Sequence, residues 1–535
     1  MFSSGNQSLL FITFRFLFLP PAAQHMTMSW KKFLEKKITR HLPAVARAAQ
    51  RLLPEDAKIA LVKSEMRNNP EMLDSLFPYR NTFPVNTRMP EKGLPKEAVL
   101  QQIREMHARE SSSWQNGKIS GSFYHGDQDH YDFLNEAFSY YSQVNSIQRD
   151  VCPSLTKYEG EIIAMALDIF HGDAVAQRDE KQKACGSLTT GGTDSIFQSV
   201  YVHREWGVQE KNISRPEIIV PISAHPAFLK AAHYLGVKVI SARLNDAFEV
   251  DVADVAAKIT PNTVLLVGSA GNYGHGIIDP IAKLSALALQ HQIGLHVDGC
   301  LGGFILAWAE PLGIDCPVFD FRLPGVTAMS ADTHKYGYSL KGTSVVLFAR
   351  ESLRRYQYFG QTDWPGGVYV SPGFNGSRSG GMFAATWAAM VHYGKEGYKQ
   401  RAQQIFAVNA EIQRRVKEIP ELKLFGQSLF MTAIGSDMFS IYHVNDYLKT
   451  KGWRMNGQQH PNGFHFCITG PQITNEGIAD AFINDLREGV AYAKVQTSDP
   501  KSAAMYGGAG REIDPSMYMP MLTAYTDVTQ SVYPF

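Results

Sequence analysis

The sequence predicts an α/β fold built on a mostly parallel sheet that is flanked by helices. Between residues 184 and 350, short apolar runs alternate with stretches of helical periodicity. This alternation is typical of parallel strands joined by crossover helices. The 44% hydrophobic fraction of the 535 residues allows a sizeable core. Six of the apolar runs predict strands: 217–223, 237–242, 264–269, 294–298, 325–330 and 344–349.

The segment before this sheet is predicted to be part irregular and part helical. Residues 54–95 are interrupted by proline and asparagine and predict an irregular connector. Apolar spacing predicts helices over 96–111, 131–144 and 157–171, and residues 120–127 are rich in turn-forming residues and predict a loop.

The segment after the sheet predicts a smaller α+β domain. Residues 366–381 form a glycine-rich loop, and two helices are expected over 384–393 and 398–419. Strands are then expected at 423–425, 438–443 and 463–468. We therefore divide the chain into an N-terminal arm and connector, a large domain and a small C-terminal domain, at residues 1–95, 96–400 and 401–535.

The N-terminal arm leaves two interpretations open. Residues 8–19 are apolar but are shorter than the roughly 20 residues of a membrane span. Residues 30–53 resemble a helix whose only acidic residue is Glu35 among many lysines and arginines. Such a stretch is typical either of a solvated basic helix or of a helix that contacts a membrane surface.

Charge and cysteine content restrict the function further. The 52 basic and 51 acidic residues give a net charge of +1, which disfavours nucleic acid as a partner. The five cysteines have no C-x-x-C spacing, which is typical of a reducing compartment and disfavours a zinc site.

The segment 328–343 contains the most informative lysine of the chain. Lys335 follows His334 and precedes the apolar run 344–349. A free ammonium is costly to bury beside sheet strands, but an amine bound covalently to an aldehyde is not. Pyridoxal 5′-phosphate (PLP) is the usual aldehyde in such sites, so Lys335 is the candidate anchor of this cofactor.

Three upstream segments supply the other groups that PLP requires. Asp298 ends the apolar run 294–298 and could keep the pyridine nitrogen protonated. Gly192 and Thr193 open a predicted helix, whose N-terminus suits a phosphate group. His225 follows another predicted strand and could stack on the pyridine ring.

These motifs, in this order, resemble the PLP-dependent decarboxylase-like family of the aspartate-aminotransferase fold (fold type I). Within it they resemble the lyases that act on phosphorylated sphingoid bases. Matching stretches include T-G-G-T-D-S-I at 190–196, S-A-H-P-A-F at 223–228, H-V-D-G-C-L-G-G-F at 296–304, S-A-D-T-H-K-Y-G-Y-S-L-K-G-T at 330–343 and G-S-R-S-G-G at 376–381.

The resemblance implies a seven-stranded, mostly parallel sheet in the large domain and a definite reaction. Such a lyase cleaves a phosphorylated long-chain base in retro-aldol fashion to a fatty aldehyde and phosphoethanolamine. It implies cofactor contacts from His334 and Ser377 beside the residues named above, and catalytic roles for Tyr124 and Tyr273. It also implies a homodimer with active sites at the interface, and substrate contacts from Lys341, Tyr124, Asn145 and Arg378.

Several alternatives stay open at this point. Lys341 could be a solvated surface lysine, and Tyr124 a core tyrosine. The chain could be an amino-acid decarboxylase on the same scaffold, or a non-enzymatic protein of this fold kept as a membrane-surface scaffold. We expect a cytoplasmic location, with or without membrane association.

Overall fold

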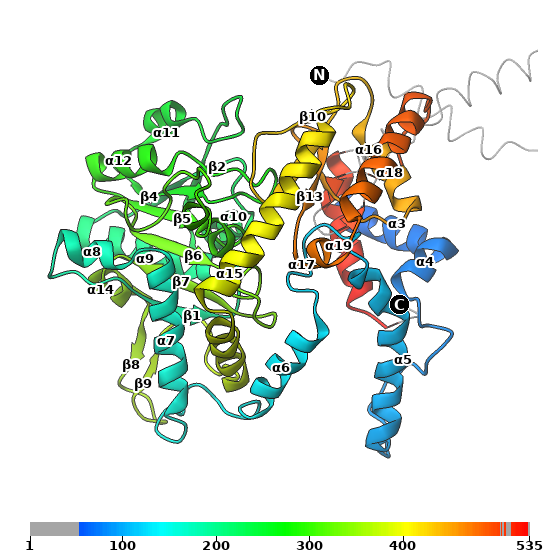
Figure 1. The fold of residues 1–535 in the computed structure, drawn as a ribbon. Helices are drawn as coiled ribbons and strands as arrows, with labels where there is room; N and C mark the ends of the chain where they lie inside the picture. Colours follow the sequence, from blue (N-terminus) through cyan, green and yellow to red (C-terminus); the bar gives the residue numbers. More distant parts are fainter. Residues whose placement is uncertain (1–52, 503, 506–507, 510–514, 533–535) are drawn as a thin grey trace, which may run out of the picture. The chain divides into compact units, whose positions relative to one another are not determined.

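The structure is a computed structural model that describes residues 53–502, 504–505, 508–509 and 515–532 (Figure 1). The apolar stretch 8–19, and all but the last residue of the basic stretch 30–53, lie outside the described residues. The chain divides into two compact units, one of residues 1–103 and 513–535 and one of residues 104–512. We describe each unit by itself.

The larger unit contains a seven-stranded sheet in which six strands run in one direction and β7 runs in the opposite direction. This confirms the predicted mostly parallel sheet, and all six predicted strands form, with small shifts at their ends. The strands pair in the order β1 (Cys185–Thr189), β7 (Ser344–Phe348), β6 (Ala328–Ala331), β5 (Gly294–Asp298), β4 (Thr263–Ser269), β2 (Glu217–Pro221) and β3 (Lys238–Ala242).

Helices cover both faces of this sheet, as a buried parallel sheet requires (Figure 1). Successive side chains of β4 point to opposite faces. Leu266 therefore belongs to one core cluster, while Leu265 and Val267 belong to another. The helices of the larger unit up to residue 416 are α6 (Gln128–Ser139), α7 (Ser154–Ile169), α8 (Asp173–Arg178), α9 (Gly192–Lys211), α10 (Ala227–Leu235), α11 (Val252–Lys258), α12 (Ile281–His291), α13 (Gly303–Leu306), α14 (Glu351–Arg354) and α15 (Gly380–Val416).

The last helix of that series joins two predicted helices. Gly394 interrupts α15 with a φ of 54° and a ψ of 179°, between the segments predicted at 384–393 and 398–419. The predicted domain boundary at residue 400 falls inside α15 and stays a prediction. Before α15, the short strands β8 (Phe359–Gln361) and β9 (Tyr369–Ser371) form a hairpin.

A second, four-stranded antiparallel sheet follows, in the order β10 (Lys423–Leu424), β11 (Met431–Gly435), β13 (Gly463–Cys467) and β12 (Asn456–Gln458). The strand predicted at 438–443 is wrong. Ile441, Val444 and Leu448 are buried at helical spacing in α16 (Ile441–Thr450). The helices α17 (Gly470–Thr474) and α18 (Ile478–Lys494) complete this part, and β14 (Ala504–Met505) pairs with β15 (Gly508–Ala509).

The predicted irregular connector over 54–95 is also wrong in part. Helices α3 (Glu55–Asn68) and α4 (Pro70–Leu76) form there. Asn69 caps α4 by accepting a hydrogen bond from the Met72 amide at 3.1 Å, and Pro70 occupies the first helical position. The proline and asparagine thus mark a helix start, where both residue types are favoured.

The predicted helix at 96–111 is confirmed as α5 (Lys96–Gln115), which begins in the smaller unit. In that unit α3 packs against α19 (Tyr518–Thr529) through a small apolar cluster that includes Val62, Met66 and Val528. Across the described residues, no helix combines the length and the apolar character that a membrane crossing needs.

Candidate active site

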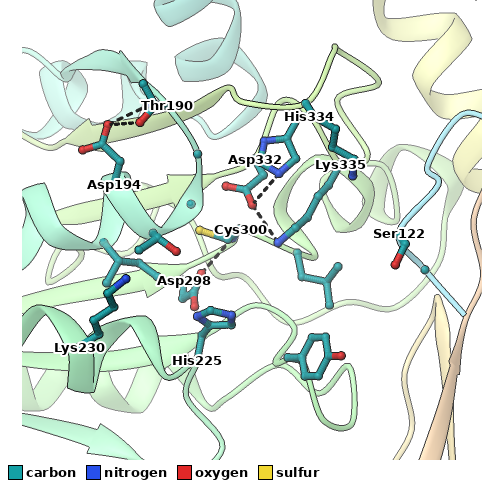
Figure 2. Close-up of a pocket in the computed structure, with 18 of the residues that line it drawn as sticks. Ser122, Thr190, Asp194, His225, Lys230, Asp298, Cys300, Asp332, His334 and Lys335 are labelled. Atoms are coloured by element: carbon teal, nitrogen blue, oxygen red, sulfur yellow. Dashed lines mark hydrogen bonds and ion pairs between the residues drawn. The ribbon is translucent and has the colours of Figure 1, made fainter. Parts of the chain in front are cut away.

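A cavity of about 840 Å³ opens where β2, β5 and β6 end, at the carboxyl edge of the large sheet. Most of the predicted site residues line it: Tyr124, Gly192, Thr193, His225, Tyr273, Asp298, His334, Lys335 and Lys341. Three predicted residues do not line it, namely Asn145, Ser377 and Arg378. Figure 2 shows how several of these side chains converge from separate strand ends.

Lys335 forms an ion pair inside this cavity. Its Nζ lies 2.8 Å from Oδ2 of Asp332, whose side chain is only 2% exposed (Figure 2). Burial by itself would lower the pKa of Lys335, but the Asp332 carboxylate raises it well above its usual range. The Asp332 carboxylate therefore holds Lys335 as an ammonium.

Asp332 is a site residue that sequence reasoning missed. It directly follows β6 and stands three residues before Lys335, so the signal was present in the S-A-D-T-H-K motif. Its Oδ1 has no hydrogen-bond partner among the described residues, although it is buried. A buried oxygen of this kind indicates a place where another polar group belongs.

Asp298 and His225 lie together in the cavity (Figure 2). Asp298 ends β5, and its Oδ1 accepts a hydrogen bond from the Cys300 amide at 3.0 Å. The Nδ1 of His225 accepts a hydrogen bond from the Ala227 amide at 3.2 Å, so this nitrogen carries no proton. Burial lowers the pKa of His225. The histidine therefore presents a neutral ring beside a buried carboxylate.

The N-terminus of α9 has the shape of an anion cradle. Gly191 precedes it with a φ of 142°, a conformation that favours glycine. A Cβ atom on Gly192 would lie 2.6 Å from the Asp332 carboxylate and 2.9 Å from the Cys300 sulfur, so only glycine fits there. The first amides of a helix have no intrahelical acceptor and point toward a bound phosphate.

His334 sits at the edge of this cradle. Its Nδ1 donates a hydrogen bond to the Thr343 carbonyl at 2.5 Å, and its Nε2 lies 3.7 Å from Asp332. Burial lowers the pKa of His334. The Thr343 contact fixes the ring orientation and leaves Nε2 on the cavity side.

Lys341 and Tyr124 form a second polar region. The Nζ of Lys341 lies 4.7 Å from the centre of the Tyr124 ring, and both residues line the cavity. The surrounding protein limits hydration of the ammonium, and with the charge of Lys335 nearby it lowers the pKa of Lys341 to about 8. Lys341 thus lines the cavity while part of its side chain stays exposed to solvent.

Three predicted residues gather elsewhere. The side-chain amide of Asn145 donates to Oγ of Ser377 at 2.8 Å. Nη1 of Arg378 donates to the Leu188 carbonyl at 2.7 Å and lies 3.6 Å from the Glu159 carboxylate. Within one chain they do not reach the cavity, and their predicted roles stay predictions.

The residues of the cavity fit pyridoxal phosphate. Lys335 offers an amine, the glycine cradle at α9 suits a phosphate, and Asp298 offers a buried carboxylate for the ring nitrogen. The volume of about 840 Å³ leaves room for a substrate beside the cofactor.

The family comparison agrees with this geometry. Residues 78–433 match the pyridoxal-dependent decarboxylase conserved domain. The chain is similar to the sphingosine-1-phosphate lyase of Dictyostelium discoideum, with 37% identity over 507 residues, 93% of this chain and 90% of that protein. It is 36% identical to sphingosine-1-phosphate lyase 1 of Mus musculus over 515 residues, 94% of this chain and 86% of that protein.

Two solved structures show the same architecture. A sphingosine-1-phosphate lyase of Burkholderia pseudomallei is 50% identical, with a TM-score of 0.77 over 78% of this chain and 95% of that one. A glutamate decarboxylase of Lactobacillus brevis is 17% identical, with a TM-score of 0.66 over 79% of this chain and 99% of that one, and shares the fold. The predicted fold type is confirmed.

Proposed function

This chain belongs to the pyridoxal-dependent decarboxylase family and, within it, to the sphingosine-1-phosphate lyases, and from this premise we propose which residues carry its reaction. The protein is a carbon–carbon lyase that uses pyridoxal phosphate. It cleaves phosphorylated sphingoid bases to a long-chain aldehyde and phosphoethanolamine. Membership of this family also disfavours the alternative that the chain is a non-enzymatic protein that serves as a membrane-surface scaffold.

The cofactor would be held by groups from four segments of the chain. Lys335 would bind it through its amine, and the α9 N-terminus with Thr193 and His334 would bind its phosphate. The neutral His225 ring would pack against the pyridine, and Asp298 would hold a proton on its nitrogen. When bound, the cofactor draws electrons from the bond that breaks at the amine-bearing carbon.

The remaining cavity residues would handle the substrate. Lys341, beside Tyr124, would bind the substrate phosphate. Tyr273 would exchange a proton with the substrate hydroxyl whose carbon becomes the aldehyde. Tyr124 would stay close to the substrate phosphate, since its ring centre lies 4.7 Å from Nζ of Lys341.

The cationic side chains of the cavity favour a lyase over an amino-acid decarboxylase. Besides the cradle at α9, the cavity has a separate cationic region at Lys341, and no arginine is present among the residues that line the cavity. A bidentate arginine is the side chain that best recognises an α-carboxylate, whereas lysine suits a phosphate. The second region therefore favours a phosphorylated substrate.

A substrate comparison tests this assignment. The purified protein would be given a phosphorylated sphingoid base and, separately, glutamate, tyrosine and Dopa. We expect a long-chain aldehyde and phosphoethanolamine from the first and no carbon dioxide from the others. Carbon dioxide release from an amino acid would contradict the assignment.

Substrate affinity is expected to fall as the pH rises through the pKa of Lys341, because the amine is charged below this value and neutral above it. With a pKa of about 8, KM for the phosphorylated substrate should rise by up to about tenfold per pH unit above that value. Lys341→Ala should raise KM and remove this dependence. Lys341→Arg, which stays charged, is the matched variant and should keep KM low above pH 8.

We also propose that two copies of the chain pair through the β8–β9 hairpin. Its patch of large apolar side chains, Phe359, Trp364, Val368 and Val370, is open to solvent, with Val368 78% exposed. Phe374, just beyond the hairpin, lines the active-site cavity. An exposed apolar patch that continues into a cavity supports an interface at the site.

Subunit mixing tests whether Asn145 and Ser377 act on the partner's cavity. Asn145→Ala/Ser377→Ala and Lys335→Ala should each lose activity as pure dimers. If the sites are shared, a hybrid dimer holds one intact site, so a 1:1 mixture should recover about a quarter of wild-type sites. A mixture that stays as inactive as its parents would place these residues in their own chain's function.

We propose a cytoplasmic location together with contact to a membrane surface. A cytoplasmic protein that touches the membrane through residues 30–53 would suit a lipid substrate. This membrane contact stays a prediction, since the stretch lies almost entirely outside the described residues.

A further inference from the structure

The four-stranded C-terminal sheet forms one wall of the active-site cavity. Asn456 of β12 and His465 and Cys467 of β13 line the cavity together with Tyr273 from the segment after β4. None of the three sheet residues has a part in the proposed chemistry. His465 is buried to 1% exposure, and its polar ring atoms are all engaged.

The hydrogen bonds of His465 fix which of its nitrogens carries the proton. Nδ1 lies 3.2 Å from the Gly274 carbonyl, which can only accept, so Nδ1 donates. Nε2 lies 3.2 Å from the side-chain amide of Asn456 and therefore accepts. Burial lowers the pKa of His465 to about 3, so the ring stays neutral at working pH.

The Asn456 amide is itself held in place. Its Nδ2 donates to Oγ of Ser120 at 3.2 Å, and this hydroxyl in turn donates to the His465 carbonyl at 3.0 Å. Oγ of Ser120 also accepts from the Cys467 amide at 2.9 Å. The orientation of the imidazole is thus set from both of its ends.

The imidazole meets Tyr273 directly. The two ring centres are 4.9 Å apart and the ring planes are nearly perpendicular, at 83°. The carbonyl that His465 binds belongs to Gly274, the next residue along the chain, and Gln458 of β12 donates to the same carbonyl. Residues of the C-terminal sheet therefore contact both the backbone next to Tyr273 and the ring of Tyr273.

We propose that His465 is a positioning residue for Tyr273: its Nδ1–H holds the Gly274 carbonyl and its ring edge sets the tyrosine ring, so that the phenol reaches the reacting substrate hydroxyl. The inference rests on the proposed proton-transfer role of Tyr273. A proton transfer depends steeply on donor–acceptor distance, so a phenol displaced by a fraction of an ångström loses much of its effect.

Two substitutions separate the two contacts of the imidazole. His465→Phe keeps an aromatic ring against Tyr273 and removes the bond to Gly274. His465→Asn can place an amide N–H near the position of Nδ1 and removes the ring. His443, a buried histidine on α16 that does not line the cavity, offers the control His443→Phe for the loss of an imidazole as such.

We expect His465→Phe to lower kcat on the order of tenfold or more, with KM for the phosphorylated substrate within about twofold of wild type. The cofactor absorbance of the resting enzyme should not change, because Lys335 and Asp298 are untouched. His465→Asn should recover part of kcat through its amide, and His443→Phe should leave kcat unchanged. A fall in cofactor absorbance parallel to activity in His465→Phe would show a merely structural role and overturn the proposal.

A double-mutant cycle with Tyr273→Phe gives the decisive result. If His465 acts through Tyr273, His465→Phe should change kcat by less than about twofold in the Tyr273→Phe background. A full, multiplicative loss there would overturn the positioning role and leave the role of Tyr273 intact. If Tyr273→Phe alone kept wild-type kcat, the proposed role of the tyrosine would fall instead, and the inference with it.

Discussion

Replacing Lys335 with alanine is expected to abolish turnover and the yellow colour that covalently bound pyridoxal phosphate gives a protein. Alanine has no amine to bind the aldehyde, and no other lysine of the cavity lies beside Asp332 in the structure. We expect kcat to fall on the order of 10⁴-fold or more. The absorbance spectrum and the steady-state rate of the same preparation measure both effects.

The ion pair with Asp332 provides the control for folding. Removing the lysine leaves a buried carboxylate without its cation, which costs about 3–5 kcal/mol of stability in comparable pairs. Lys335→Ala/Asp332→Asn removes both charges and should recover most of the thermal stability while remaining inactive. If Lys335→Ala kept its colour or its turnover, Lys335 would not be the anchor.

Asp332 lies in the same motif as Lys335 but was not among the predicted site residues. The position of Asp298 followed from a local rule, since a polar residue at the end of a buried strand lies at the ligand edge of a parallel sheet. That rule applies equally to Asp332, at the end of β6. The cost of burying the ammonium is offset by a counter-ion three residues away as well as by covalent chemistry.

The C-terminal wall of the site could not be predicted for a different reason. His465 and Asn456 meet Gly274 and Ser120, which are far away along the chain. No local pattern encodes such pairings. The strand at 463–468 was predicted and forms as β13, but β12 has only three residues, too few for a clear alternation of apolar and polar residues.

The fold contains a strand and a helix that local patterns did not predict. The strand β1 (Cys185–Thr189) has the sequence C-G-S-L-T and no apolar run, and its pairing with β7 makes it a strand. Asn69 and Pro70 are typical of irregular segments and predicted a connector, but in the structure they begin the helix α4. Long periodic segments such as α7 and α9 were predictable because burial along one face repeats over several turns.

The carboxylate of Asp298 is expected to matter through its charge rather than its shape. Asp298→Asn retains an oxygen that can accept the hydrogen bond from the Cys300 amide, so the local backbone should be preserved. A neutral amide cannot stabilise a positive charge on the pyridine nitrogen. We expect kcat to fall on the order of 10² to 10³-fold while the protein still binds the cofactor and keeps its visible absorbance.

Reconstitution with N-methyl pyridoxal phosphate separates the charge of the ring from every other effect of the substitution. Its ring nitrogen is permanently positive and needs no carboxylate to hold a proton. The Asp298→Asn protein loaded with this analogue should therefore recover part of the lost kcat, because the positive charge of the ring no longer depends on a neighbouring carboxylate. The wild-type protein should gain nothing from the analogue. Wild-type turnover by Asp298→Asn with ordinary pyridoxal phosphate would remove this residue from the mechanism, and low turnover of the variant with both cofactors would assign Asp298 to positioning of the ring instead.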